Sequence, residues 1–311
     1  MAFLFPGQGA QYVGMGKDFY ENFAIAKQVF ETSDDLLGWS FSRLIFEGPK
    51  EDLTQTKNSQ LAIYIVSWAI HQVLRQEYPD LIPYVCAGLS LGEYTALAAT
   101  GKISFTEGLR LVDQRAKLMQ EACEISPGSL RVVLGMEPEE IQSVLNILPP
   151  EAYACIANVN CPGQVVIAGT VYGLDLASEE LKKKGGKRIL PLEVSGAFHS
   201  RLMLSAEQGL APYIKESILR ETQIRLVMNT PGEFVDDLSS IRSNLIEQVT
   251  HPVYWQRGIK MMEKEGVACF IEMGCGKTLQ GMNKRIGVQS STYSVEKIEE
   301  IGGLANVVVK G

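Results

Sequence analysis

The chain has 311 residues, of which 46% are hydrophobic and 21% are charged, as in an ordinary globular protein. Its net charge of −7 argues against a nucleic-acid partner, and no apolar stretch approaches the roughly twenty residues that span a membrane. The six cysteines form no C-x-x-C pair and the N-terminus lacks the basic start of a signal peptide, so we expect a cytoplasmic enzyme with reduced thiols and no metal.

The chain begins with a short apolar run, residues 2–5, that is typical of a buried strand and leads into the glycine-rich loop PGQGAQ. Helical periodicity follows at 17–37, 59–77, 91–99 and 106–124. In the last third, strand-like runs at 224–229 and 267–272 are interleaved with helical patterns at 240–248 and 255–265. Strands that alternate with helices predict a mostly parallel sheet covered on both faces.

The sequence GLSLG, residues 88–92, lies where an apolar, strand-like run gives way to a helix-forming segment. In a nucleophile elbow the chain turns so sharply from strand to helix that the serine takes strained backbone angles. A Cβ at either flanking glycine would then collide with neighbouring backbone. The pattern predicts that Ser90 is a nucleophile and that the next helix directs N–H groups at a developing oxyanion. The alternative is a glycine-containing turn that holds an ordinary serine.

The predicted helix 106–124 carries one charged residue on its apolar face. At about 100° per residue, Arg115 lies beside Leu111 and Ala122, whereas the other charged side chains share the opposite arc. Burial of a guanidinium is unfavourable unless a partner compensates for its desolvation. The planar fork of arginine matches a carboxylate, so Arg115 either forms a structural ion pair or, beside a nucleophilic serine, binds a substrate that carries a carboxylate.

The middle segment has the element order of a ferredoxin-like unit. Strands are predicted at 130–135, 152–159, 164–169 and 187–194, helices at 137–148 and 172–185, and a hairpin turn at 160–163. We therefore predict an α/β fold with a hydrolase-like core, residues 1–126 and 195–311, and an inserted ferredoxin-like subdomain, residues 127–194. A cleft between two such parts is a frequent place for a ligand.

A serine hydroxyl needs a base to remove its proton, and the sequence offers three histidines. His71 lies in an apolar-rich helix and is expected to be packed there. His251 precedes Pro252 and would suit the late histidine of an α/β-hydrolase. His199 follows a strand-like run, on a loop of the kind where α/β folds place catalytic groups. The residue pattern ranks His199 first but leaves the choice open.

An ordered set of motifs runs nearly from end to end: FPGQGAQ (5–11), GLSLGEYTAL (88–97), QRAKLMQEA (114–122), NVNCPGQVVIAG (158–169), GAFHS (196–200), EQVTHPVYW (247–255) and EMGCGKTLQGMNKRI (272–286). With this set the chain resembles the malonyl-CoA:acyl carrier protein transacylases and the related acyltransferase domains of fatty-acid and polyketide synthases. The resemblance implies transfer of a malonyl group from malonyl-CoA to the phosphopantetheine thiol of acyl carrier protein. It also implies a malonyl-serine intermediate and no cofactor.

The resemblance assigns the catalytic roles. Ser90 and His199 would form a dyad, and an oxygen at Gln248 would orient the far nitrogen of the histidine in place of a buried aspartate. The backbone N–H groups of Gln11 and Leu91 would form the oxyanion hole.

The resemblance also assigns substrate contacts. Arg115 would hold the malonyl carboxylate, Asn160 would lie at the subdomain interface, and Phe198 would crowd any substituent on the α-carbon. The GAFH motif is similar to the malonyl-selective form of the family, which differs in acyltransferases that use branched extender units.

Three positions depart from the family pattern: Leu89 where histidine is frequent, Arg131 where a small residue is usual, and Cys275 where proline is expected. None of them belongs to the dyad, but Leu89 and Arg131 leave the fine substrate preference open. The competing functions are a serine hydrolase that uses His251 and a non-catalytic binder of acyl-CoA or carrier protein.

The implied partners are malonyl-CoA and an acidic acyl carrier protein, with no nucleic acid and no membrane. Because this chain is itself acidic, docking such a carrier needs a local basic patch. The cluster at 182–188 and the pair Lys284–Arg285 are the two candidates. A self-standing chain that starts at FPGQG favours the fatty-acid pathway over polyketide synthesis, and a monomer.

Overall fold

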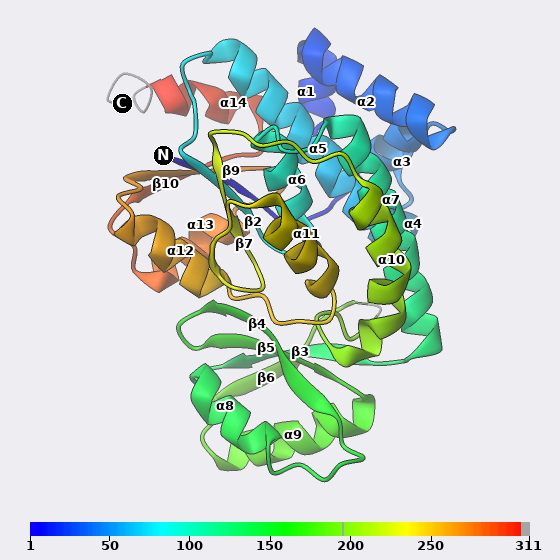
Figure 1. The fold of residues 1–311 in the computed structure, drawn as a ribbon, viewed down its shortest axis with the longest axis vertical. Coiled ribbons are helices and arrows are strands. Elements are labelled where there is room, and N and C mark those ends of the chain that lie inside the picture. The colour runs from blue at the N-terminus through cyan, green and yellow to red at the C-terminus, as the bar shows by residue number, and fades with distance from the viewer. Residues whose placement is uncertain (195, 306–311) are drawn as a thin grey trace.

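The computed structural model describes residues 1–194 and 196–305. Its larger sheet, sheet A, has the strand order β10-β9-β1-β2-β7-β8 and is parallel except at the β7–β8 edge (Figure 1). The strands are β1 Ala2–Phe5, β2 Val85–Gly88, β7 Arg225–Met228, β8 Glu233–Phe234, β9 Cys269–Met273 and β10 Ser291–Val295. The predicted mostly parallel sheet is confirmed.

Helices cover both faces of sheet A, because successive side chains of a strand point to opposite faces. Ala2 and Leu4 of β1 pack with residues of α12 and α13, whereas Phe3 and Phe5 belong to the larger cluster built around α5, α6 and α7. The helices of this part are α1 Lys17–Asn22, α2 Ala24–Leu37, α3 Phe41–Glu47, α4 Lys50–Thr54, α5 Thr56–Glu77, α6 Gly92–Ala99, α7 Phe105–Ile125, α10 Leu204–Glu216, α11 Leu238–Glu247, α12 Trp255–Lys264, α13 Thr278–Ile286 and α14 Ile298–Ile301. In the part of the chain described, no helix is both long and apolar enough to cross a membrane.

The second sheet, sheet B, forms a separate layer with α8 and α9 in the lower part of Figure 1. Its elements are β3 Ser129–Leu134, α8 Pro138–Leu145, β4 Ala154–Cys161, β5 Gln164–Gly169, α9 Val171–Lys183 and β6 Arg188–Pro191. The β-α-β-β-α-β order and the antiparallel sheet β4-β5-β3-β6 agree with the predicted ferredoxin-like unit. All these elements lie within 127–194, although the domain boundaries themselves stay predictions.

The two faces of sheet B have different neighbours. Leu130 and Val132 of β3 belong to the hydrophobic cluster of the core, whereas Val133 packs with side chains of α8 and α9. Sheet B therefore presents one face to its own helices and the other to sheet A and its surrounding helices. The space between the two sheets is where the predicted cleft is expected.

The carboxyl ends of three neighbouring strands meet at one edge of sheet A. Phe5, the last residue of β1, pairs with Gly88, the last residue of β2, and Ala87 pairs with Val227 near the end of β7. The loop after Phe5, the turn after Gly88 and the loop after β7 are therefore adjacent. In α/β sheets ligands bind at this edge.

Several boundaries differ from the predictions. The predicted helix 17–37 is two helices, because Phe23 is extended (φ −128°, ψ 118°) between α1 and α2. The predicted strand 187–194 is paired only over Arg188–Pro191. Several elements were not predicted from the sequence, namely α3, α4, α10, α13, α14, β8 and β10.

Candidate active site

The turn between β2 and α6 is a strained elbow. Ser90 has a φ of 51°, in the left-handed region that residues with a side chain rarely adopt. A Cβ on Gly88 would lie 1.9 Å from the carbonyl carbon of Gly92, and a Cβ on Gly92 would lie 2.1 Å from the carbonyl oxygen of Phe5. No side chain fits at either position, which confirms the predicted backbone collision.

His199 contacts the serine of this elbow. Its Nε2 lies 2.8 Å from Ser90 Oγ, and its Nδ1 lies 2.8 Å from the backbone carbonyl oxygen of Gln248. A carbonyl oxygen only accepts, so Nδ1 carries the proton and Nε2 is free to accept from the serine hydroxyl. Burial, and next the positive charge of Arg115, lower the pKa of His199 to about 4, so the imidazole is neutral at physiological pH.

The two other histidines have other partners. His71 is buried against the ring of Phe3, and burial lowers its pKa to about 3. His251 is exposed, and its Nδ1 lies 3.0 Å from the carbonyl oxygen of Glu247. In the described residues neither forms a hydrogen bond with Ser90. The geometry therefore selects His199 and removes the basis for a hydrolase that uses His251.

Arg115, on α7, is 1% exposed and reaches the same serine. Its Nη2 donates to Ser90 Oγ at 3.1 Å and to Gln248 Oε1 at 2.9 Å, and its Nη1 donates to Gln60 Oε1. Within the described part of the chain no carboxylate lies within 4.0 Å of the guanidinium. The structural ion pair considered from the sequence is therefore not formed. Burial lowers the pKa of Arg115.

A hydrogen-bonded network beneath the elbow fixes its backbone. Asn229, in the loop after β7, accepts from the Ser90 N–H at 2.6 Å and donates to the Gly88 carbonyl at 2.7 Å. Glu93 of α6 accepts from the Asn229 backbone N–H at 2.6 Å and from Gln248 Nε2 at 2.9 Å. Burial raises the pKa of Glu93, and these donors together with the nearby guanidinium oppose the rise.

Three members of this network, Gln60, Glu93 and Asn229, were not predicted from the sequence. Glu93 had a usable signal, since it is an acid in the otherwise apolar helix GEYTALAA, all of which is buried. Gln60 is likewise a polar residue in the apolar stretch SQLAIYIV of α5. For Asn229 the sequence carries no such signal.

The predicted oxyanion donors lie on adjacent loops. The loop after β1 packs tightly on the elbow, because a Cβ on Gly7 would lie 2.4 Å from the Leu89 carbonyl oxygen. In the described residues the backbone N–H groups of Gln11 and Leu91 have no acceptor, whereas the N–H of Ser90 is bonded within the network. Two free N–H groups thus remain on the loops that flank the serine.

A cavity of about 240 Å³ opens between sheets A and B, as expected for the cleft. Ser90 and His199 line it, together with Asn160 of β4 and Phe198. Asn160 Oδ1 is buried without a hydrogen-bond partner, so it is free to accept a hydrogen bond from a polar group of a ligand. The other predicted site residues, Gln11, Leu91, Arg115 and Gln248, are not part of the cavity wall. Nowhere in residues 1–194 and 196–305 do three His, Cys, Asp or Glu side chains form a group that could hold a metal ion.

This geometry agrees with comparisons with known proteins. The sequence profile described as "Acyl transferase domain" matches residues 2–300. The chain belongs to the acyl transferase domain family. It is 39% identical to the malonyl CoA-acyl carrier protein transacylase of Bacillus subtilis, over 97% of this chain and 95% of that protein. The Haemophilus influenzae protein of the same name is 34% identical over 99% of each chain.

Solved structures of acyl transferases have the same fold. The acyl-carrier-protein-S-malonyltransferase of Bartonella henselae superposes with a TM-score of 0.94, at 36% identity, and 99% of each chain is covered. A malonyl-transacylase in complex with a type II PKS acyl-carrier protein superposes with a TM-score of 0.94, at 35% identity, over 98% of this chain and 99% of that chain. The family resemblance and the fold class predicted from the sequence are confirmed.

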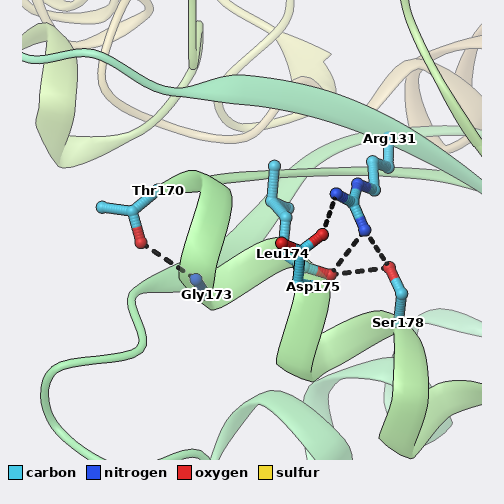
Figure 2. A network of polar contacts seen from close by, with 6 residues as sticks. All are labelled: Arg131, Thr170, Gly173, Leu174, Asp175 and Ser178. Carbon is cyan, nitrogen blue, oxygen red and sulfur yellow. Dashed lines mark hydrogen bonds and ion pairs between the residues drawn. The ribbon is translucent and has the colours of Figure 1, made fainter.

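The three departures from the acyl transferase pattern occupy different environments. Leu89 lines the cavity, as its position before the serine suggested. Arg131 does not line the cavity and binds α9 instead, with Nη1 donating to the Leu174 carbonyl at 3.0 Å (Figure 2). The strand alternation turns Arg131 to the helix-covered face of sheet B, so it lies on the opposite face from Leu130 and Val132, which line the cavity. Cys275 is fully buried, with its Sγ 3.1 Å from Met15 Sδ.

Proposed function

We propose that this protein transfers a malonyl group from malonyl-CoA to the phosphopantetheine thiol of an acyl carrier protein through a malonyl ester of Ser90. The observation that carries the proposal is the guanidinium of Arg115, which is buried beside Ser90 Oγ and has only amide and hydroxyl partners. A buried cation in this setting favours a ligand that brings its own negative charge. A malonyl thioester carries such a carboxylate two bonds from the carbonyl carbon that is attacked.

In the first half-reaction Ser90 Oγ attacks the thioester carbonyl carbon while His199 Nε2 takes the hydroxyl proton. The oxyanion receives hydrogen bonds from the N–H groups of Leu91 and Gln11, each worth about 3 kcal/mol of barrier lowering in such sites. The carbon–sulfur bond then breaks, and His199 returns its proton to the sulfur of departing coenzyme A. Acid–base assistance of this kind contributes about 10²–10⁴-fold in rate.

In the second half-reaction the carrier thiol attacks the malonyl ester, and His199 takes the thiol proton. The carbon–oxygen bond to Ser90 breaks and the same proton returns to Oγ, so the free enzyme is restored. Gln248 holds His199 through its backbone carbonyl, which keeps the ring in the tautomer that both half-reactions need. All steps use side-chain and backbone groups of this chain alone, and we propose that it needs no resident cofactor.

We propose that the cavity residues set which acyl group fits. The unpartnered Asn160 oxygen offers an acceptor to a polar part of the substrate, and the buried Phe198 restricts space next to the dyad. A branched α-carbon would meet this ring, so unsubstituted malonyl is the preferred group.

For the acceptor, both basic patches lie at one end of sheet B. Arg188 of β6 pairs with Leu134, which pairs with Gln164 of β5, and Gln164 also lines the cavity. Arg285 at the end of α13 donates to Gln164 Oε1 at 2.8 Å. We propose that an acidic carrier protein docks here, next to the cavity through which its phosphopantetheine arm would reach Ser90.

Two carrier classes remain possible acceptors. The relatives are named malonyl CoA-acyl carrier protein transacylases, which supports an acyl carrier protein as acceptor. We propose a fatty-acid carrier first, and the similarity to a transacylase solved with a type II PKS carrier favours a polyketide carrier as the second candidate. Transfer rates to purified carriers of both classes decide between them. We further propose a cytoplasmic monomer, which size-exclusion chromatography with light scattering tests for the oligomeric state.

The decisive experiment is incubation with malonyl-CoA, rapid acid quench and peptide mass spectrometry. We expect a malonylated peptide that contains Ser90, no such peptide in Ser90→Ala, and loss of the label when carrier protein is added. An unlabelled peptide, or label that disappears equally fast in water alone, would overturn the transferase assignment.

A further inference from the structure

Glu93 is a fully buried acid that the reaction steps do not use. It lies one turn after Ser90, in the first turn of α6, and both of its carboxyl oxygens accept N–H bonds. One oxygen takes the backbone N–H of Asn229 and the other takes Gln248 Nε2. In the described residues no lysine, arginine or histidine pairs with it. Its partners are therefore the groups that hold the elbow and the arginine.

The side-chain amide of Gln248 has two ends with opposite requirements. Its Nε2 lies 2.9 Å from the Ser90 carbonyl oxygen and 2.9 Å from Glu93 Oε1. The Ser90 carbonyl only accepts, so the amide must present its NH₂ to it, and the same NH₂ donates to Glu93 Oε1. Its Oε1 is then left facing Arg115 Nη2 at 2.9 Å. If the amide were reversed, two donors would meet at Arg115 and two acceptors at Ser90.

The arrangement also places one neutral amide between the buried guanidinium and a buried acid. The Arg115 guanidinium and the Glu93 carboxylate both bind Gln248, but they do not form an ion pair. A direct ion pair would occupy the fork of the guanidinium with an internal acid. The bridging amide instead keeps the acid nearby and leaves the arginine without a carboxylate partner.

We propose that Glu93 is a positioning residue for acyl-group selectivity, which orients the Gln248 amide so that Arg115 is held at Ser90 and stays available to a substrate carboxylate. The proposal rests on the malonyl transfer proposed above. It differs from a purely structural role, such as a favourable charge at the N-terminus of α6, because that role would support every acyl substrate equally.

Two variants of Glu93 disturb its contacts with Asn229 and Gln248 in different ways. Glu93→Gln keeps the side-chain length, but its NH₂ must face either the Asn229 N–H or Gln248 Nε2, so one pair of buried donors results. Glu93→Asp keeps the charge but is one methylene too short to hold both partners. In each variant we expect the ratio of kcat/KM for malonyl-CoA to that for acetyl-CoA, measured by acylation of Ser90, to fall about tenfold or more.

Glu107→Gln is the matched control, because Glu107 also lies in the first turn of a helix, α7, without contacting the site. Its ratio of kcat/KM for malonyl-CoA to that for acetyl-CoA should equal that of the wild type. An unchanged ratio in Glu93→Asp would overturn the proposal, as would equal losses for malonyl and acetyl in the Glu93 variants. If Glu93→Gln does not fold, the ratio measured for Glu93→Asp alone tests the positioning role of Glu93.

A double-mutant cycle tests whether Glu93 acts through Gln248. Gln248→Met removes both the oxygen and the NH₂ of the amide at similar volume. The double variant Gln248→Met/Glu93→Gln should therefore have the same malonyl-to-acetyl ratio of kcat/KM as Gln248→Met alone. Additive losses would overturn the proposed route. The wild-type protein distinguishes failure of the proposed function from failure of this inference. If the wild type forms no malonyl-Ser90, the proposed function fails. If the wild type and the Glu93 variants all prefer malonyl-CoA over acetyl-CoA equally, only this inference fails.

Discussion

The Nη2 of Arg115 lies 3.1 Å from Ser90 Oγ, although 25 residues separate the two in the chain. The guanidinium is held there by the amide oxygens of Gln60 and Gln248 rather than by a carboxylate. A positive charge is therefore fixed beside the nucleophile and has no countercharge in direct contact. This relationship connects the fold to the proposed choice of a negatively charged acyl group.

Replacing Arg115 should change selectivity more than catalysis. Arg115→Ala is expected to lower kcat/KM for malonyl-CoA about a hundredfold relative to acetyl-CoA, because charge-assisted bonds to a carboxylate contribute about 3 kcal/mol. The malonyl-to-acetyl ratio of Arg115→Lys should lie between those of the wild type and Arg115→Ala, since lysine keeps the charge but lacks the planar fork. Quenched-flow acylation with both thioesters measures the ratio, and an equal loss for both would contradict the carboxylate role.

The acid limb of the pH profile should report His199. Only the neutral imidazole can accept the Ser90 proton, and the pKa of His199 is lowered to about 4, so kcat/KM should fall only as the pH drops below about 4. Arg115→Ala removes one of the two causes of this low pKa and should move the limb to higher pH. Acetyl-CoA is the substrate for both proteins. His251→Ala should leave the limb unchanged, and a limb that moves in His251→Ala would contradict the assignment to His199, whereas a wild-type limb near 6.5 would contradict the lowered pKa.

A methyl group at Gly92 should disrupt the elbow. Its Cβ would lie 2.1 Å from the Phe5 carbonyl oxygen, so Gly92→Ala is expected to lower the free energy of unfolding by about 3 kcal/mol and to abolish acylation. Gly281→Ala in α13 is the control, because a Cβ there meets nothing within 4 Å. It should raise the free energy of unfolding by about 0.5–1 kcal/mol. Urea titration measures both, and equal effects would exclude the steric account.

Arg131 should contribute to stability and not to selectivity. It donates to the Leu174 carbonyl and to Ser178 Oγ, and it pairs with Asp175 (Figure 2). Arg131→Ala is expected to lower the free energy of unfolding by about 1–2 kcal/mol. Asp175→Asn, at a carboxylate that is 59% exposed, should change it by less than about 0.5 kcal/mol. The malonyl-to-acetyl ratio should stay the same in both variants, and a changed ratio would show that Arg131 influences substrate selectivity.

Features that depend on neighbours in the chain could be predicted from the sequence. The elbow follows from glycines two residues to either side of Ser90, and the buried face of α7 follows from the helical period that places Arg115 among apolar residues. The element order of 127–194 follows from alternating periodicities in the same way. Weak periodicity explains the failures: α3 and α4 are too short to show a pattern, and the break at Phe23 has no glycine or proline to mark it.

The sequence by itself thus determined a strained serine, an arginine on an apolar helix face and the order of strands and helices, because each depends on local backbone geometry. Only the tertiary structure decided between His199 and His251, since His199 lies 109 residues from Ser90 and reaches it through the packing of separate loops. It also decided that Arg115 meets amides rather than an acid, and that Glu93, Asn229 and Gln248 form one network. Hydrogen bonds between distant segments leave no period in the sequence, and they exist only where the sheet edge brings those segments together.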